Sequence, residues 1–326
     1  MQLIINTYGS YLQKNGDCFK VKADDKVFEV SCKKVSSILI STSAYITTDA
    51  IKMAIENNID IVFIDDFGNP YGRVWHPKLG STVLIRRRQL EKGNCLDGVE
   101  LAKKWISIKL QNQKEFITRL RKNREDLKNE LTEKINIIDL SIEAISKLSA
   151  DNIDEVRNKI MTIEASGSKA YFEALSICMP EGYKFSKRSR DPAEDYFNAM
   201  LNYSYGILYS IVEKACIIAG LDPYIGFLHS DNYNKKSLVF DIIEMYRIFG
   251  DEVVTYLFTR RQVKNEFFDP VPGGFSLNKE GKAFLIENFN NFMNEPIKYK
   301  GRMIKRINII QLDMHELANS FIKEEG

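Results

Sequence analysis

An imidazole and two carboxylates occur close together in the stretch from residue 220 to residue 247. His229 follows a short apolar segment, and Asp241 and Glu244 fall in a later run of mostly apolar residues that predicts a buried helix. Residues three apart on a helix are neighbours, so Asp241, Glu244 and Arg247 would form one polar strip. Imidazole and carboxylate groups are common metal ligands. The pattern fits a metal site, and it equally fits an ion-paired helix face.

A third carboxylate, Glu164, lies on a helix predicted from residue 153 to residue 178. It falls at the edge of the apolar face that Ile160 marks one turn earlier. The residues at 165–168 are all small, which leaves room for another element to approach closely. Glu164 therefore lies either at the solvent boundary or in a cleft.

Several basic clusters along the chain could hold phosphate groups. Each cluster alone is usually a solvated surface, and its meaning depends on whether it shares a face with the acidic residues. The candidate DNA-binding residues are Arg188, Arg190, Lys235, Lys236 and Arg247.

The chain of 326 residues is long enough for two domains, and its 44% hydrophobic residues suffice for a sizeable core. A formal net charge of +2 weakens a nucleic-acid hypothesis without excluding it, because binding needs only a local patch. The 5 cysteines are scattered and include no C-x-x-C pair, so they indicate neither a zinc site nor a disulfide framework.

The N-terminus lacks the basic start and apolar run of a signal peptide. No segment approaches the ~20 apolar residues that a membrane span requires. We expect a soluble, cytoplasmic protein without a membrane partner.

Residues 1 to about 75 predict strands. Asn15-Gly16 is a strong hairpin signal, since both central positions of such a turn favour positive φ. Thr48 is expected to cap a short helix that ends near Asn57, and residues 65–70 are expected to form a turn.

Beyond Ser81 the apolar spacing becomes helical almost to the end of the chain. Gly220 is expected to be the left-handed C-cap of one helix. Residues 268–274, which include two prolines and two glycines, are expected to form a mobile loop. The predicted fold class is α+β, with a β-rich N-terminal domain at residues 1–80, expected to dimerise, and an all-α catalytic domain at residues 81–326.

Several segments resemble the CRISPR-associated spacer-acquisition integrase family, the universal "Cas-one" protein. The signature-like segments are GLDPYIGFLH at residues 220–229 and SLVFDIIEMYR at residues 237–247. RSRDP at residues 188–192 and NAMLNYSYGILY at residues 198–209 resemble the segment before the signature. Ile163-Glu164 with Tyr171-Phe172 resembles the first catalytic segment. The resemblance covers essentially the whole chain.

The resemblance implies that Glu164, His229 and Glu244 are metal ligands and that Asp241 is the accompanying catalytic acid. The family often has a glycine directly after the first acid, whereas this chain has Ala165. Small residues still follow Glu164, so close packing is expected to be preserved.

The implied activity is that of a metal-dependent DNA endonuclease and integrase. Two carboxylates favour Mg²⁺, and an imidazole shifts the preference towards Mn²⁺. Such an ion polarises a phosphodiester and activates a hydroxyl. Attack by water cleaves DNA, and attack by the 3′-hydroxyl of an incoming fragment joins it into a repeat array.

The resemblance also implies a homodimer, a complex with the small "Cas-two" partner, and double-stranded or branched DNA as substrate. Two alternatives stay open: a catalytically silent DNA-binding scaffold, and a general DNA repair nuclease.

Overall fold

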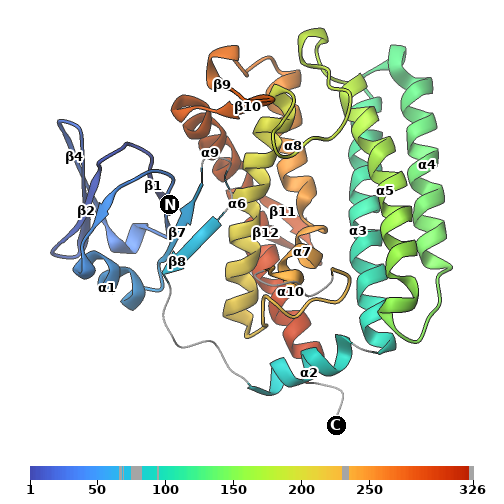
Figure 1. Ribbon diagram of the computed structural model, residues 1–326, viewed down its shortest axis with the longest axis horizontal. Coiled ribbons are helices and arrows are strands. Elements are labelled where there is room, and N and C mark those ends of the chain that lie inside the picture. The colour runs from blue at the N-terminus through green and yellow to red at the C-terminus, as the bar shows by residue number, and fades with distance from the viewer. Residues whose placement is uncertain (66–67, 69, 75–82, 94, 230–234, 323–326) are drawn as a thin grey trace.

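The computed structural model describes residues 1–65, 68, 70–74, 83–93, 95–229 and 235–322. A β-rich N-terminal part lies beside a larger, mostly helical part (Figure 1). The predicted α+β fold class is confirmed. The predicted domain boundary at residue 80 lies outside the described residues.

The N-terminal part contains two four-stranded sheets. The first has the order β1-β5-β7-β8, with β1, β5 and β7 parallel and β8 antiparallel to β7. Its strands are β1 (Gln2–Ile5), β5 (Ser37–Ile40), β7 (Asp60–Ile64) and β8 (Pro70–Val74). The second has the order β4-β3-β2-β6 and consists of β2 (Tyr11–Asn15), β3 (Cys18–Ala23), β4 (Lys26–Ser31) and β6 (Tyr45–Ile46).

Local sequence signals explain most of these elements. The predicted hairpin joins β2 to β3, and Gly16 has φ 56°. Asn15 still pairs with Cys18, so the two turn residues are Gly16 and Asp17 and the predicted turn was wrong by one residue. The helix α1 (Thr48–Glu56) is capped by the Thr47 side chain, which accepts a hydrogen bond from the Ala50 amide, so the prediction of Thr48 as the cap was wrong by one residue. β8 was not predicted, because proline and glycine within its five residues are more typical of turns.

The central strands of the first sheet, β5 and β7, are buried on both faces. Ile38 and Ile40 pack in a small core with the second sheet and α1. Leu39 and Val62 belong to the larger core of the helical part. Alternate side chains of a strand point to opposite faces, so this one sheet joins the two parts of the molecule.

The helical part has two groups of helices. α3 (Leu96–Arg121), α4 (Lys128–Ser146) and α5 (Ile153–Ile177) pack side by side (Figure 1). The long α6 (Tyr196–Ala219) contacts β7 and β8 on one side and the C-terminal helices on the other. These are α7 (Ser237–Ile243), α8 (Arg247–Thr259), α9 (Lys279–Asn294) and α10 (Arg306–Ser320), while α2 (Val83–Gly93) packs against α3. Short 3₁₀ turns occur at Cys32–Lys34, Glu125–Leu127, Glu181–Tyr183 and Asn265–Phe267.

The ends of the site-bearing helices follow the expected capping chemistry. The side chains of Asn152 and Asp195 accept hydrogen bonds from amides in the first turns of α5 and α6. Gly220 has φ 85° and ends α6 as the predicted left-handed cap.

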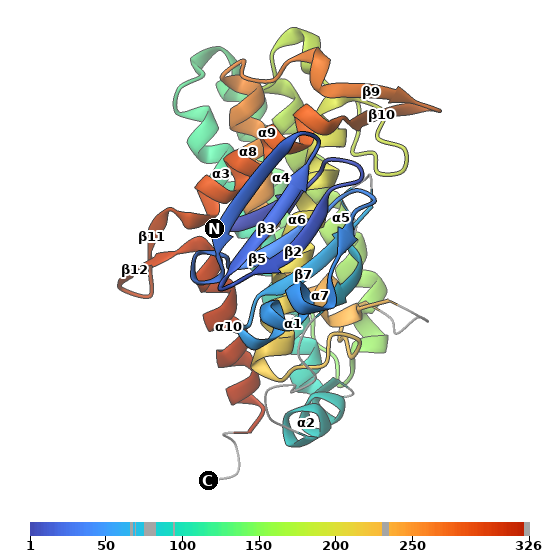
Figure 2. The ribbon, with the colours of Figure 1, turned by 90° about the vertical axis from the view of Figure 1, so that its left-hand side faces the viewer.

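The helical part also carries two β-hairpins, which the prediction of an all-α domain missed. The first, β9 (Phe268–Val271) and β10 (Gly274–Leu277), replaces the predicted loop at residues 268–274. The second is β11 (Pro296–Tyr299) with β12 (Arg302–Lys305), and both project from the helices in Figure 2. Strands of four residues are too short to show the alternation by which longer strands are recognised, and β9 and β11 also contain proline.

Within the described ranges, no helix combines the length and apolar character that crossing a bilayer requires. All five cysteines are free thiols, as expected from their scattered positions.

Candidate metal centre and nucleic-acid groove

Glu244 lies at a break between two helices. The apolar run that holds Asp241 and Glu244 was predicted to form one helix, but α7 ends at Ile243 and α8 begins only at Arg247. Glu244 is buried, and its Oε1 accepts a hydrogen bond from Arg247 Nε at 2.8 Å. The predicted strip is therefore half correct: Glu244 and Arg247 pair, whereas Asp241 points to a different partner.

Glu164 and Glu244 share one cation, the ammonium group of Lys109 on α3. Lys109 Nζ lies 2.5 Å from Glu244 Oε2 and donates a short hydrogen bond to Glu164 Oε1. The contact with Glu244 is an ion pair. Ser168 Oγ also donates to Glu164 Oε1, at 2.6 Å. Two carboxylates 80 residues apart in sequence (244 − 164 = 80) thus meet at a single positive charge.

Burial and charge oppose each other in this cluster, and charge prevails. Burial alone would raise the pKa of the Glu244 carboxyl, but Arg247 and Lys109 hold it well below its ordinary value. Burial would lower the pKa of the Lys109 ammonium, but Glu244 and Glu164 raise it above its usual range. Glu244 and Lys109 are therefore both ionised at neutral pH, and with Glu164 and Arg247 they form a cluster of two carboxylates and two basic side chains.

Asp241 organises the turn that carries His229. Its fully buried carboxylate accepts hydrogen bonds from the amides of Phe227, Leu228 and His229 at 2.6, 3.1 and 2.9 Å. Asp241 Oδ1 also lies 2.6 Å from His229 Nδ1. A carboxylate only accepts, so Nδ1 carries the proton and Nε2 is the ring nitrogen with a lone pair for a metal. This is the arrangement by which a carboxylate orients a ligating histidine.

The structure thus brings the predicted site residues together as two pairs. Glu164 meets Glu244 through Lys109, and His229 meets Asp241. Within the part of the chain that the structure describes, no three His, Cys, Asp or Glu side chains are grouped closely enough to hold one metal ion.

The carboxylate pair nevertheless fits a hard divalent cation. Both carboxylates already converge on one positive charge, so an oxygen of each faces the same position. Oxygen ligands of this kind suit Mg²⁺ and Mn²⁺. The third ligand, His229, stays a prediction.

A cavity of about 360 Å³ opens beside Glu164. Lys109 and Glu164 line it together with Arg188, Arg190 and Arg247. A second cavity, of about 690 Å³, shares these three arginines and extends past Tyr71 and Tyr224 to Lys235 and Lys236. The two cavities share part of their lining, and we call the region that they span, from the carboxylates to β8, the arginine groove.

Two guanidinium groups in the arginine groove lie over one aromatic ring. The Tyr205 ring centroid is 4.6 Å from Arg247 Cζ and 5.4 Å from Arg188 Cζ. Tyr205 and Tyr171 donate hydrogen bonds of 2.5 and 2.9 Å to the buried Asp251, whose pKa burial raises to about 6. Burial lowers the pKa of Arg188 to about 10, so its side chain stays charged at neutral pH.

The five predicted DNA-binding residues differ in how far their charges are already used. Lys236 is paired with the buried Glu213 at 2.6 Å, and Arg247 is paired with Glu244. Arg188 donates hydrogen bonds to Asn198 and Asn202, at 2.9 and 2.5 Å. Arg190 and Lys235 are exposed and line the groove, so their charges are the most available to a phosphate.

Two residues of the site, Lys109 and Gln113, were missed from the sequence. Both lie on the buried face of α3, where apolar residues such as Trp105, Ile106 and Leu110 recur at helical spacing. A lysine and a glutamine on an apolar stripe are the signal that could have found them, because buried polar groups need a partner.

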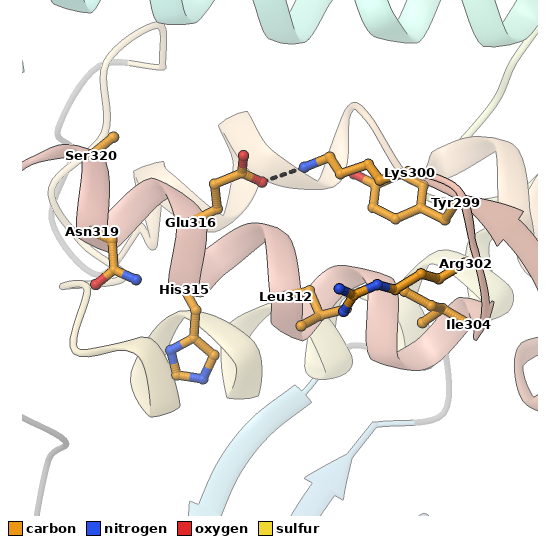
Figure 3. Close-up of a pocket in the computed structure, with 9 residues that line it drawn as sticks. All are labelled: Tyr299, Lys300, Arg302, Ile304, Leu312, His315, Glu316, Asn319 and Ser320. Carbon is orange, nitrogen blue, oxygen red and sulfur yellow. Dashed lines mark hydrogen bonds and ion pairs between the residues drawn. The ribbon is translucent and has the colours of Figure 1, made fainter.

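A further cavity, of about 640 Å³, lies between the β11–β12 hairpin and α10 (Figure 3). Its lining includes Arg302 and His315, and Lys300 forms an ion pair with Glu316 across one side. None of the predicted site residues lines this cavity.

Comparison with known proteins gives a consistent result. The family model described as CRISPR associated protein Cas1 matches residues 3–291. A protein of Archaeoglobus fulgidus named CRISPR-associated endonuclease Cas1 1 is 34% identical over 100% of this chain and 97% of the relative. A protein of Methanobrevibacter ruminantium named CRISPR-associated protein Cas1 3 is 31% identical over 85% of this chain and 84% of the relative.

Solved structures share the fold. A casposase bound to integration product superposes with a TM-score of 0.87 at 23% identity, covering 100% of this chain and 92% of that one. A CAS1 protein from Thermotoga maritima gives 0.81 at 19% identity, covering 100% and 98%. A Cas6-RT-Cas1–Cas2 complex gives 0.79 at 20% identity and covers 99% of this chain but 35% of that much longer one.

Proposed function

Because the chain belongs to the Cas1 family of CRISPR-associated proteins, we propose that it is a DNA endonuclease and integrase of CRISPR adaptation. The relative from Archaeoglobus fulgidus is named an endonuclease, and the casposase structure contains an integration product. Both names support phosphodiester chemistry on DNA for this chain.

The observation that carries the proposal is the meeting of Glu164 and Glu244 at one cation beside the arginine groove. Two carboxylates from different helices, Glu164 and Glu244, would hold Mg²⁺ or Mn²⁺, and His229, oriented by Asp241, would be the third ligand. When bound, the metal supplies electrophilic polarisation of the phosphodiester.

The chain's own residues would bind and orient the DNA. Arg188 and Arg190 would contact phosphate oxygens along the groove, and Arg247 would keep the Glu244 carboxylate ionised and fixed. A hydroxyl oxygen attacks phosphorus and loses its proton, while the bond to the leaving oxygen breaks and that oxygen gains a proton. Water as the nucleophile gives cleavage, and a DNA 3′-hydroxyl gives strand transfer.

The proposal includes two protein partners. A complex with Cas2 is supported by the Cas1–Cas2 assembly among the structural neighbours.

A homodimer through the second sheet is supported by its edge strand β4, where Val27 and Phe28 are 55% and 56% exposed. An open edge with exposed apolar side chains is a ready pairing surface. Phe28→Glu is expected to give a monomer in analytical ultracentrifugation, and an unchanged dimer would contradict this interface. The proposed location is the cytoplasm.

A strand-transfer assay on branched DNA with Mn²⁺ or Mg²⁺ tests the proposal. We expect each of three substitutions to lower the strand-transfer rate by at least about 100-fold, because charge stabilisation by the metal ion contributes several kcal/mol. These substitutions are Glu164→Gln, Glu244→Gln and His229→Ala. Glu173→Gln is the matched control, because Glu173 lines the same cavity but pairs with Lys134. Full activity of all three site variants would refute the assignment.

A catalytically silent DNA-binding scaffold is the second candidate. One observation favours it: the charges of Glu164, Glu244, Lys109 and Arg247 already balance without a metal. A scaffold predicts salt-sensitive DNA binding and no strand transfer at any metal concentration, so a metal titration separates the two. For a general repair nuclease, DNA carrying the repeat would be no better a substrate than other branched DNA.

A further inference from the structure

The ammonium group of Lys109 occupies the position between the two carboxylates of the proposed metal centre. It contacts Glu164 Oε1 and Glu244 Oε2, and its side chain is buried on α3. No other cation contacts Glu164 among the described residues. In this state the lysine supplies the positive charge that balances the buried Glu244 carboxylate and the half-buried Glu164 carboxylate.

A divalent ion bound by the same two carboxylates would repel this ammonium group. Both cations seek the same oxygen atoms, and like charges in a buried site strongly disfavour each other. Metal binding through Glu164 and Glu244 therefore requires Lys109 to release at least one of them.

The cavity beside the site offers the released lysine an acceptor. Gln113 lies one turn after Lys109 on α3, a spacing at which side chains are neighbours, and both residues line the 360 Å³ cavity. Gln113 is only 3% exposed, and its Oε1 has no hydrogen-bond partner within the described ranges. A buried carbonyl oxygen without a donor is costly, so a nearby ammonium group would satisfy it.

We propose that Lys109 is an internal cation that occupies the metal position until a divalent ion displaces it towards Gln113. The inference rests on the proposed metal-dependent function and goes beyond it, because it gives Lys109 and Gln113 opposite effects on metal affinity. Lys109 competes with the metal and so weakens its binding. Gln113 stabilises the displaced lysine and so strengthens metal binding. Both are positioning residues.

Mn²⁺ binding, measured by electron paramagnetic resonance on the full chain without DNA, tests the proposal. Lys109→Met is expected to bind Mn²⁺ about tenfold or more tightly, since a competing state is removed. It should also show a lower Tm without metal and a larger Mn²⁺-induced rise in Tm than the wild type. Gln113→Leu, which leaves every charge paired, is expected to bind Mn²⁺ about fivefold more weakly, the equivalent of one hydrogen bond.

The double variant decides whether the two residues act together. The effect of Gln113→Leu on Mn²⁺ affinity should vanish in the Lys109→Met background, because no displaced ammonium group is left to donate a hydrogen bond to residue 113. Lys114→Met, on the same helix in a surface pair with Asp139, is the control and should leave Mn²⁺ affinity unchanged.

Mn²⁺ binding no tighter in Lys109→Met than in the wild type would overturn the inference, as would an unchanged Gln113→Leu effect in the double variant. These results leave the proposed function standing if the wild type binds Mn²⁺ and transfers strands. A wild type that binds no Mn²⁺ would instead remove the metal centre and, with it, the inference.

Discussion

Replacing Asp241 with asparagine tests how the His229 turn is held. The carboxylate accepts from three backbone amides and from His229 Nδ1, two donors on each oxygen. Asparagine keeps one carbonyl oxygen, and its NH₂ group faces the two donors on the other side. Hydrogen bonds to a charged group contribute about 1.5–3 kcal/mol each, so the loss of two predicts a destabilisation of at least about 3 kcal/mol.

Thermal unfolding followed by circular dichroism measures this effect. About 2 °C per kcal/mol for a chain of this size predicts a fall in Tm of about 6 °C. Strand transfer should fall about 10- to 100-fold, because His229 loses the group that fixes its orientation and tautomer. Asp269→Asn, at an exposed acid on β9, is the control. If Asp241→Asn kept both the wild-type Tm and the wild-type rate, the organising role assigned to this carboxylate would be refuted.

Three further predictions concern pH, packing and DNA binding. Burial raises the pKa of Asp251 to about 6, so its contribution to stability is full below the pKa of the unfolded chain and is lost as pH rises through about 6. Relative to Asp251→Asn, the wild type should lose about 3 kcal/mol of unfolding free energy between about pH 4 and pH 7, measured by urea titration. An equal pH dependence in both proteins would contradict this. Gly206→Ala would gain about 1 kcal/mol from helix propensity, but the added Cβ would lie 1.9 Å from the Gly68 carbonyl oxygen. We therefore expect the variant to have a lower Tm than the wild type. A higher Tm would show that the backbone relaxes without cost at this contact. Arg190→Ala should weaken DNA binding in fluorescence anisotropy and reduce the slope of log affinity against log salt concentration by about 1. The control Lys52→Ala on α1 should change neither the affinity nor the slope. Equal slopes for Arg190→Ala and the wild type would show that Arg190 does not contact DNA.

Much of the fold could be predicted because local signals agree with it. The hairpin at Asn15-Gly16, the apolar faces of α3 to α6 and the cap at Gly220 all depend on residues near in sequence. The two short hairpins and β8 were missed, because strands of four or five residues are too short to show a clear alternation and β8, β9 and β11 contain proline, which is more typical of turns.

The site was predicted less completely than the fold. The resemblance identified Glu164, His229, Asp241 and Glu244, but residue spacing implied that Asp241 and Glu244 share one helix face. The break after Ile243 separates them, and no glycine or proline in the chain marks that break. The role of Lys109 depends on the approach of α3 to α5 and α7, which spacing along a single helix does not reveal.

Anomalous diffraction from crystals of the protein grown with Mn²⁺ tests the central claim most directly. We predict one manganese peak bonded to carboxylate oxygens of Glu164 and Glu244 and to Nε2 of His229, with the Lys109 ammonium no longer between the two carboxylates. A lysine that still bridges Glu164 and Glu244 at saturating Mn²⁺, with no manganese peak beside them, would contradict it.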